Sequence, residues 1–381
     1  MGKPTNKTSP GDFRRRYSAG IKLRDLPGLW RQDWRRAYAI LTRDHAREEL
    51  PRGWFRRSWY NTKTLFLELS YKLSPPRRLL FALCVILALL GLQTENVEVT
   101  SDSVEVWEHP ALLVASVIGL LFLLIVELAD RVVVRDELEV ARQLQRELLP
   151  QDPPDLAGYE FRFSYRSANT VGGDYFDFVP LADGRLALVS ADASGHGIAS
   201  GLLMAIANST LKLAVDLDPD PAAVGRIMNK ALKATGGRRS FLTMFFGLLE
   251  PESGRLEYVC AGHPFPLLRR AGGGVESLGT GSLPLGLRDS LELAPAETRF
   301  LPGDILVLYT DGIPETVDCS DADFGFERLE DCLSETGTAS EIHDRILADL
   351  ASFEGDEALK DDRSLVVIAR NSAPASAEYS G

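Results

Sequence analysis

The chain has 381 residues, of which 45% are hydrophobic and 25% are charged. This composition excludes a fibrous or wholly disordered protein. The net charge of −12 is unevenly spread: residues 1–78 hold 19 Lys/Arg and 7 Asp/Glu, a local charge of +12, so residues 79–381 carry −24. A basic head joined to an acidic body predicts that the head meets an anionic surface, either nucleic acid or a membrane.

The basic head, residues 1–78, interleaves arginine with Trp, Tyr, Phe and Leu, as in WRQDWRRAYAILTRDHAREEL and GWFRRSWYNTKTLFLELSYKL. This pattern is typical of helices that lie along the inner headgroup region of a bilayer. The alternative is a small solvated helical cap with no lipid contact. We expect a cytoplasmic juxtamembrane segment without a fold of its own.

Two apolar runs follow the head, at residues 79–94 and 109–126, and neither contains a charged residue. A helix needs about 17 or more apolar residues to span a bilayer. The second run meets this limit, and the first is marginal, with a buried core helix as its alternative. The sequence predicts a transmembrane helical hairpin over residues 79–126.

The connector between these runs, residues 95–108, contains five acidic residues and no Lys or Arg. The positive-inside rule therefore places the head in the cytoplasm and the connector outside. The second span returns the rest of the chain to the cytoplasm. The expected location is a bacterial inner (cytoplasmic) membrane with both termini in the cytoplasm, and the basic head then requires no nucleic acid partner.

Residues 127–150 are rich in strong helix formers and end at a proline, which predicts a helical signalling linker. An imperfect heptad face has Gln145 as a polar break. This face is compatible with a two-stranded coiled coil, and hence a homodimer through residues 130–149, or with docking onto the next domain. Its apolar members are Val134, Leu138, Ala141 and Leu148.

The body, residues 151–371, alternates polar and apolar residues with period two and has clear turn signals, whereas residues 372–381 are expected to be a disordered tail. Helices are expected at 197–215, from Asp220 as the cap, and near 339–353. Strands in hairpins with helices set apart indicate an α+β fold of antiparallel sheets covered by helices. The predicted strands contain YEFRFSYR, YFDFV, RLALVSA, SFLTMFFGLLE, RLEYVCA, DILVLYT and SLVVIAR.

The four cysteines are scattered, without the spacing of a metal finger. We interpret them as reduced core thiols in a reducing compartment. They are Cys84, Cys260, Cys319 and Cys332.

Aspartates stand where several of these strands begin or end, although Asp is depleted in strand interiors. Each alone could be a turn former beside glycine. Together they form an oxygen-only donor set, which selects hard cations such as Mg²⁺ or Mn²⁺. Two such ions sharing carboxylates and a water suit in-line attack on phosphorus. The acids are Asp174, Asp192, Asp311, Asp361 and Asp362.

Successive motifs resemble those of the SpoIIE/RsbU-type serine phosphatases, which belong to the PPM (type 2C) metal-dependent class. The resemblance covers about residues 140–370 and implies an α-β-β-α sandwich with two Mn²⁺ or Mg²⁺ ions between the sheets. The motifs are ARQLQRELLP, VGGDYFDF, ADASGHGIASGLLMA, FLTMFFGLLEPESGRLEYVCAGHPFPLL, GSLPLGL, GDILVLYTDGIPE, FGFERL and DDRSLVVI.

The resemblance implies metal ligands, through which catalysis would run: the carboxylates of Asp174, Asp192, Asp311 and Asp361 and the backbone carbonyl of Ala193. It also implies supporting positions around these ligands: Asp177, Asp362, Gly173 and Gly195. Ala193 stands where the family usually has Val, and Pro314 where Thr often follows. Neither departure removes a ligand.

Three further residues have two interpretations each. His196 could donate a proton to the leaving serine oxygen or pack within its loop. Arg166 could clamp the phosphate or be an exposed strand residue. His263 is expected to shape a turn.

The function expected from the resemblance is a membrane-anchored phosphoserine/phosphothreonine protein phosphatase of bacterial signalling. Its partners would be phosphorylated STAS-type anti-anti-sigma factors or related regulators. The alternative is a non-catalytic membrane sensor or scaffold module with a phosphatase-like fold. Degenerate modules usually lose metal ligands, and here all four acids are present.

Overall fold

The computed structural model describes residues 70–92, 97–100, 103–106, 110–235, 240–355 and 359–371, together with 60, 63 and 67. Most of the basic head and the tail at 372–381 lie outside the described residues, so the expectations for both stay predictions. The chain divides into two compact units, Met1–Val132 and Val133–Gly381, which are described separately.

The first unit contains two helices, α4 (Pro75–Gly91) and the first part of α5 (Pro110–Leu148). Prolines occupy the first turn of α4, where their missing N–H groups leave no hydrogen bond unmade. The two helices form a hairpin: the Ser116 hydroxyl donates to the Cys84 carbonyl over 2.7 Å, and Arg77 pairs with Asp130 at 2.6 Å. A side chain at Gly119 would clash with the Cys84 sulfur, so the backbones approach closely there.

The outer sides of this helix pair are apolar and exposed. In α5 the apolar window is long and hydrophobic enough to cross a membrane, with a mean hydropathy of 2.8. At 17 residues, α4 is shorter than the usual span. Large apolar side chains at least half exposed on α4 and on the first-unit part of α5 are Leu79, Leu83, Ile86, Leu89, Val114, Val117, Ile118, Leu121, Phe122, Leu124, Ile125, Leu128 and Val132.

The connector between the two apolar helices contains an element that the sequence did not reveal. Strands β1 (Val97–Thr100) and β2 (Ser103–Val106) pair as an antiparallel hairpin within the predicted outside loop. Four residues per strand are too few for a period-two pattern to stand out.

The second unit is a sandwich of two five-stranded sheets whose paired strands are antiparallel, as predicted. One sheet has the order β10-β7-β6-β5-β4 and the other β3-β12-β11-β8-β9. The strands of the first are β4 (Asp174–Pro180), β5 (Leu186–Ala193), β6 (Leu242–Glu250), β7 (Arg255–Ala261) and β10 (Ala296–Arg299). Those of the second are β3 (Tyr159–Arg166), β8 (Leu267–Arg269), β9 (Val275–Ser277), β11 (Ile305–Tyr309) and β12 (Arg363–Arg370).

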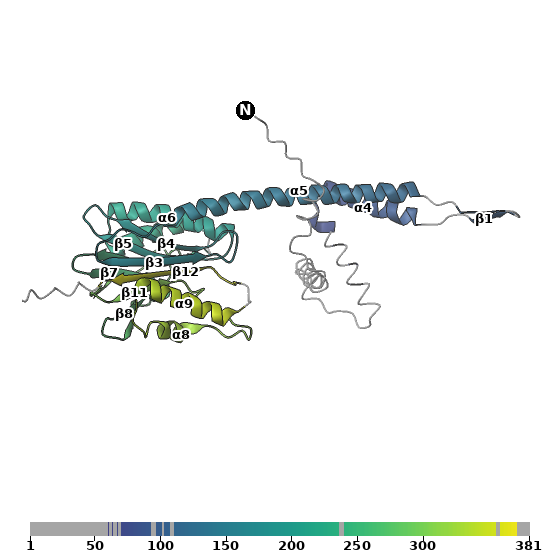
Figure 1. The fold of residues 1–381 in the computed structure, drawn as a ribbon. Coiled ribbons are helices and arrows are strands. Elements are labelled where there is room, and N and C mark those ends of the chain that lie inside the picture. Colours follow the sequence, from purple (N-terminus) through teal and green to yellow (C-terminus); the bar gives the residue numbers. More distant parts are fainter. Residues whose placement is uncertain are drawn as a thin grey trace, which may run out of the picture. The chain divides into compact units, whose positions relative to one another are not determined.

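Helices cover the outer faces of both sheets (Figure 1). On the first sheet lie α6 (Ile198–Leu217) and α7 (Pro221–Thr235), and on the second α8 (Gly325–Cys332) and α9 (Ala339–Glu354). Asp220 caps α7 as expected, accepting a hydrogen bond from the Ala223 N–H. Although α6 is also apolar enough to pass as a span, half of its window is buried inside the domain, so it is a core helix.

The core between the sheets is aromatic where β3 faces β4. Phe161 and Phe163 pack edge-on or tilted against Phe176 and Phe178, with ring centroids 5.2–5.8 Å apart between the sheets. Such pairs stabilise by about 0.5–1.5 kcal/mol beyond their burial. A second core under α8 and α9 contains Ile342 and Ile346.

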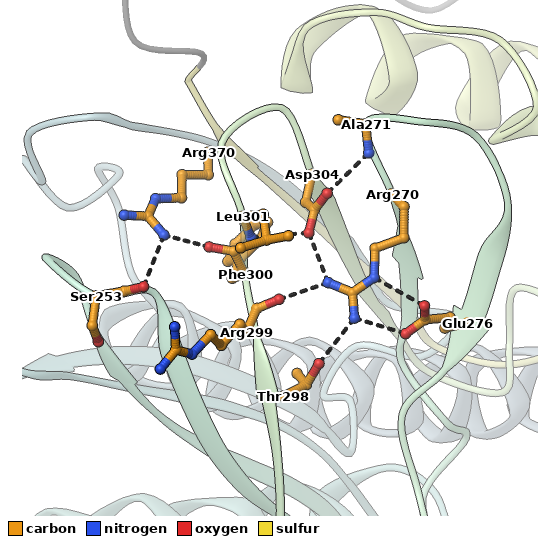
Figure 2. A network of polar contacts seen from close by, with 10 residues as sticks. All are labelled: Ser253, Arg270, Ala271, Glu276, Thr298, Arg299, Phe300, Leu301, Asp304 and Arg370. Atoms are coloured by element: carbon orange, nitrogen blue, oxygen red, sulfur yellow. Dashed lines mark hydrogen bonds and ion pairs between the residues drawn. The ribbon is translucent and has the colours of Figure 1, made fainter.

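Two arginines tie the sheets together at one edge of the sandwich (Figure 2). Arg270, just after β8, forms two hydrogen bonds to Glu276 on β9 and an ion pair of 2.8 Å with Asp304. It also donates to Thr298 and to the Arg299 carbonyl on β10, an edge strand of the other sheet. The second is Arg370 at the end of β12, which donates to the carbonyls of Phe300 and Ser253.

The interpretation of all four cysteines as core thiols was wrong for one of them. Cys84, Cys260 and Cys332 are buried and unbridged, whereas Cys319 is exposed. Cys319 lies in an acidic loop between Thr316 and Asp323, outside every helix and strand, where composition gives no hint of burial.

Candidate functional site

The strand ends bring two of the predicted acids directly opposite each other. In the antiparallel β4–β5 pair, Asp174 and Asp192 are register partners. Opposite residues on one face have Cβ atoms about 4.5–5.5 Å apart, so these carboxylates are neighbours. Asp174 is only 2% exposed, and the Thr310 hydroxyl donates to its Oδ2 over 2.6 Å. Since Thr310 follows β11, the second sheet contributes directly to holding Asp174.

Acids from the second sheet complete the cluster. Asp311 follows Thr310, and Asp361 precedes β12 with its side chain accepting the Asp362 N–H. Burial first, then the charges of Asp311 and Asp361, raises the pKa of Asp192 to about 7. Burial first, then Asp361 and Glu315, raises the pKa of Asp311 to about 6. These mutual effects show that the acids of both sheets converge on one place.

Asp174 is the most deeply buried of the acids whose pKa is raised. Burial and the charge of Asp192 raise its pKa well above the ordinary value, and the hydrogen bond from Thr310 lowers it. Like charges confined out of water disfavour ionisation, and a bound cation would relieve this.

Asp362 organises the loop that leads into β4 and is 6% exposed. Its Oδ1 accepts hydrogen bonds from the Ser167 hydroxyl (2.9 Å) and the Ala168 N–H (2.7 Å). Its Oδ2 accepts from the Gly173 N–H over 2.6 Å. This carboxylate therefore fixes the chain immediately before Asp174 from the opposite sheet.

The two glycines before Asp174 are required by close packing. A side chain at Gly172 would clash with the Tyr165 hydroxyl, and one at Gly173 would lie 2.7 Å from the Ala193 carbonyl oxygen. The Ala193 N–H in turn donates to the Gly173 carbonyl over 3.1 Å. The predicted carbonyl ligand at Ala193 thus lies beside the acid pair.

The linker helix α5 also reaches this turn. Gln145, 6% exposed, accepts from the Gly172 N–H at 2.9 Å and donates to the Gly172 carbonyl at 2.5 Å. Leu149 is buried in the sandwich core and Leu148 packs against it. Of the two alternatives for the heptad face, its C-terminal part therefore docks on the domain.

Several predicted residues are not brought to the acid cluster. Asp177 lies on the opposite face of β4, because strand side chains alternate, and it contacts Tyr175 and Lys212 of α6. Arg166 is exposed and pairs with Glu354 at 3.4 Å. His196 is exposed in the turn after β5, beside Gly195, so it is not packed within its loop.

His263 is a buried structural histidine. Its ring nitrogens lie 3.0 Å from the Ser190 hydroxyl and 2.9 Å from the Thr243 hydroxyl, on strands β5 and β6. Burial lowers its pKa to about 3, so the ring stays neutral. It holds the turn after β7 against the sheet.

The chemistry of the donor set fits a hard divalent cation: it consists of carboxylate and carbonyl oxygens, and burial first, then neighbouring charges, raises the pKa values of Asp174, Asp192 and Asp311. Within the described ranges, no three carboxylate, imidazole or thiol groups already stand in a coordination geometry. Sequence reasoning missed Thr310 and the part that Gln145 takes. Two signals could have found them. Thr310 directly precedes Asp311 at the end of a strand, and Gln145 is the single polar residue on an otherwise apolar helix face.

Two antiparallel sheets flanked by helices, with acids from both sheets meeting at one edge, define the class of PP2C-type phosphatase domains. Residues 182–371 match the family model of Stage II sporulation protein E (SpoIIE). The domain therefore belongs to the SpoIIE-type PP2C family.

Relatives and solved structures agree with this assignment. Protein IcfG of Synechocystis sp. is 26% identical over 266 residues, 62% of this chain and 42% of IcfG. Phosphoserine phosphatase RsbP of Bacillus subtilis is 23% identical over 241 residues, 61% of this chain and 57% of RsbP. The chain thus spans about half the length of these two relatives.

Among solved structures, the SiaA-PP2C domain of Pseudomonas aeruginosa superposes with a TM-score of 0.58 at 21% identity, covering 63% of this chain and 98% of that domain. The RsbU and RsbW domains of a Mycobacterium tuberculosis protein give a TM-score of 0.50 at 26% identity, covering 58% of this chain and 64% of that one.

Proposed function

We propose that this chain is a membrane-anchored, metal-dependent phosphoserine/phosphothreonine protein phosphatase of bacterial signalling. The observation that carries the proposal is the meeting of acids from both sheets, which are buried and crowded enough to raise the pKa values of Asp174, Asp192 and Asp311. A structural ion pair would include a lysine or arginine that lowers the pKa of the acid. Among the described residues, no lysine or arginine acts in this way on Asp174, Asp192 or Asp311.

Two Mn²⁺ or Mg²⁺ ions would be held by Asp174, Asp192, Asp311, Asp361 and the Ala193 carbonyl. Bound there, such ions supply charge compensation for the phosphate and activation of a water for attack on phosphorus. The surrounding residues set the geometry in advance. Thr310 orients the Asp174 carboxylate, and Asp362 fixes the loop before it.

Two exposed residues outside the cluster are candidates for substrate contacts. His196 lies in the turn after β5, three residues beyond Ala193, where it could protonate the leaving serine oxygen. Arg166 is the register partner of Arg363, close behind the paired acids 361 and 362, and could bind the phosphate after leaving Glu354.

The names of two relatives support a class of substrate. RsbP is named a phosphoserine phosphatase, and the Mycobacterium tuberculosis structure joins RsbU and RsbW domains. The first supports a phosphoserine substrate. We therefore propose a phosphorylated regulator protein, of the STAS type, as the partner.

Membrane anchoring is supported by the helix pair of the first unit. Its outer side chains are apolar and exposed, and its contact surface uses small residues and a Ser-to-carbonyl hydrogen bond. Close packing of small residues is typical of helices associating in lipid. Both termini would lie in the cytoplasm, at the bacterial inner membrane.

The linker also supports a homodimer through residues 130–149. Val133, Val140 and Leu144 of α5 are more than half exposed on the described part of the helix. Their spacing of seven and four residues is that of a coiled-coil seam. A second copy of α5 would cover them.

The decisive test is turnover of a phosphoserine regulator protein by the full chain in detergent, with and without Mn²⁺. Asp192→Asn and Asp311→Asn should each lower Mn²⁺-dependent turnover by about a hundredfold or more, while the unfolding temperature stays near that of the wild type. Asp183→Asn is the matched control, because among the described residues this exposed acid on the β4–β5 turn pairs with Arg185 alone.

Near-normal turnover of either cluster variant would refute the site. A wild-type chain that binds the phosphorylated regulator but releases no phosphate with Mn²⁺ would favour the non-catalytic scaffold.

A further inference from the structure

Gln145 is the one polar side chain on the predicted apolar face of the linker helix, and its amide group is fully used. Its oxygen accepts from the Gly172 N–H and its nitrogen donates to the Gly172 carbonyl. A glutamine side chain can hold both polar groups of one peptide residue because it has a donor and an acceptor on the same planar group. Its 6% exposure excludes water as an equivalent partner.

The residues after Gly172 are held one by one. Gly173 donates to Asp362 and accepts from Ala193. Asp174 then accepts from Thr310. Gly172 is the first member of this series and is bound to α5, whereas the others are bound to the two sheets.

The end of α5 that contains Gln145 is itself anchored. The Asn208 amide on α6 donates to the Leu148 carbonyl at 3.2 Å and to the Tyr175 hydroxyl at 3.1 Å. Tyr175 directly follows Asp174. The C-terminal end of α5 is therefore connected to the residues before Asp174 through Gln145 and to the residue after it through Asn208. Leu149 is 7% exposed in the core.

We propose that Gln145 is a positioning residue for Asp174, so that the linker helix forms part of the metal-binding site. The inference rests on the proposed function for its metal readout. Without the Gln145 amide, the Gly172 N–H and carbonyl lose their partners in a buried place, and each unmade bond costs about 1–3 kcal/mol. The turn relieves this by moving, and the Asp174 carboxylate moves with it.

The experiment compares Gln145→Leu, Gln145→Glu and the control Gln143→Leu in the full chain in detergent. Gln143 is exposed on the same helix, and its side chain bonds to Glu147 alone within the part of the chain that the structure describes. Two quantities are measured: hydrogen–deuterium exchange of the peptide covering residues 169–175 in metal-free protein, and the Mn²⁺ dissociation constant by calorimetry.

We expect Gln145→Leu to speed exchange in 169–175 and weaken Mn²⁺ binding by about tenfold each, since a single lost hydrogen bond is of this order. Gln145→Glu keeps the acceptor for the Gly172 N–H and should lie between Leu and wild type. Gln143→Leu should match the wild type in both.

Unchanged exchange and Mn²⁺ affinity in Gln145→Leu would overturn the proposal. If that variant does not fold, Gln145→Glu decides by the same criteria, since it is nearly isosteric. If the wild type binds no Mn²⁺, the proposed function fails, and the exchange of the metal-free variants still decides whether Gln145 holds the turn.

Discussion

Asp192 shows how a single position can be unfavourable for folding and suitable for chemistry. It faces Asp174 across the strand pair, and burial, followed by the charges of Asp311 and Asp361, raises its pKa to about 7. An acid held in its neutral form at neutral pH needs surroundings that are fixed by the rest of the fold. A cation bound at the proposed site would displace this proton, so its affinity would rise with pH.

The first prediction concerns the stability of the metal-free chain as pH changes. The folded pKa values of Asp192 (about 7) and Asp311 (about 6) are raised above the unfolded value of about 3.9. Between these limits the folded state binds more protons, so stability falls as pH rises and levels off above pH 7. The unfolding temperature should drop by roughly 5 °C or more from pH 5 to 7.5.

Scanning calorimetry in a chelating buffer measures this slope. Asp192→Asn should flatten it, since an amide does not titrate, and Asp183→Asn should keep it. Equal slopes for Asp192→Asn and wild type would show that Asp192 titrates normally.

At the scale of secondary-structure elements, the sandwich depends on contacts at its edge as well as on its core. Arg270 bonds to Glu276 and Asp304 within one sheet and to β10 of the other (Figure 2). Asp304 is only 1% exposed, so it depends on this arginine for charge compensation.

Arg270→Met should therefore lower the free energy of unfolding by about 2–3 kcal/mol, because the buried Asp304 carboxylate loses its charged partner. Water reaches this carboxylate only in part. Turnover at saturating Mn²⁺ should be unchanged. Urea unfolding measures the effect. Arg255→Met is the control: its pairs with Glu257 and Glu297 are exposed, and it should change little. Equal effects of the two variants would contradict the role of Arg270.

The linker helix gives the next prediction. Replacing both Val140 and Leu144 with lysine should convert a dimer to a monomer, because charges in a seam are not compensated. Sedimentation of the full chain in detergent measures the mass, and Glu139→Lys on the same helix is the control. A dimer that persists in the double variant would place the interface elsewhere. Truncation at residue 153 is a poor test, since it also removes Gln145 and Leu149.

How far the sequence predicts these elements depends on their length. Strands of seven to nine residues were predicted: β3 has a period-two pattern, and β4, β5 and β6 are largely apolar runs bounded by turns. Those of three or four residues, β8 to β10, were missed because they have too few positions to show it. The acids were found from their place at strand ends.

The partners of those acids were harder to predict. Which residue faces which depends on register, and Thr310 reaches Asp174 across 136 positions of chain. The expectation for Asp177 fails for a similar reason. Asp177 is three positions after Asp174, and an odd spacing along a strand places its side chain on the other face of β4. In the sequence, Gln145 is only a polar break in a heptad face. Its partner Gly172 is 27 positions away, and the two meet only when α5 docks on the domain.

For the whole molecule, the division of charge and the apolar helix pair predict topology. A cysteine placed at Ser101, in the acidic connector, should react with an impermeant maleimide added to intact cells, and one at Gly20 should not. The exposed Cys319 is an internal control, since it should react only after lysis. Labelling at residue 20 but not at residue 101 in intact cells would show that the orientation is the opposite of the predicted one.

One continuous helix from Pro110 to Leu148 also limits how such proteins can diversify. Each residue added to a helix turns its two ends by about 100° relative to each other. Within residues 133–148, an insertion of one residue before Leu138 would turn Val133 and Val134 by about 100° relative to Gln145, whereas seven residues would restore their positions to within about 20°. The lengths of this linker among relatives should therefore cluster at near-whole helical turns.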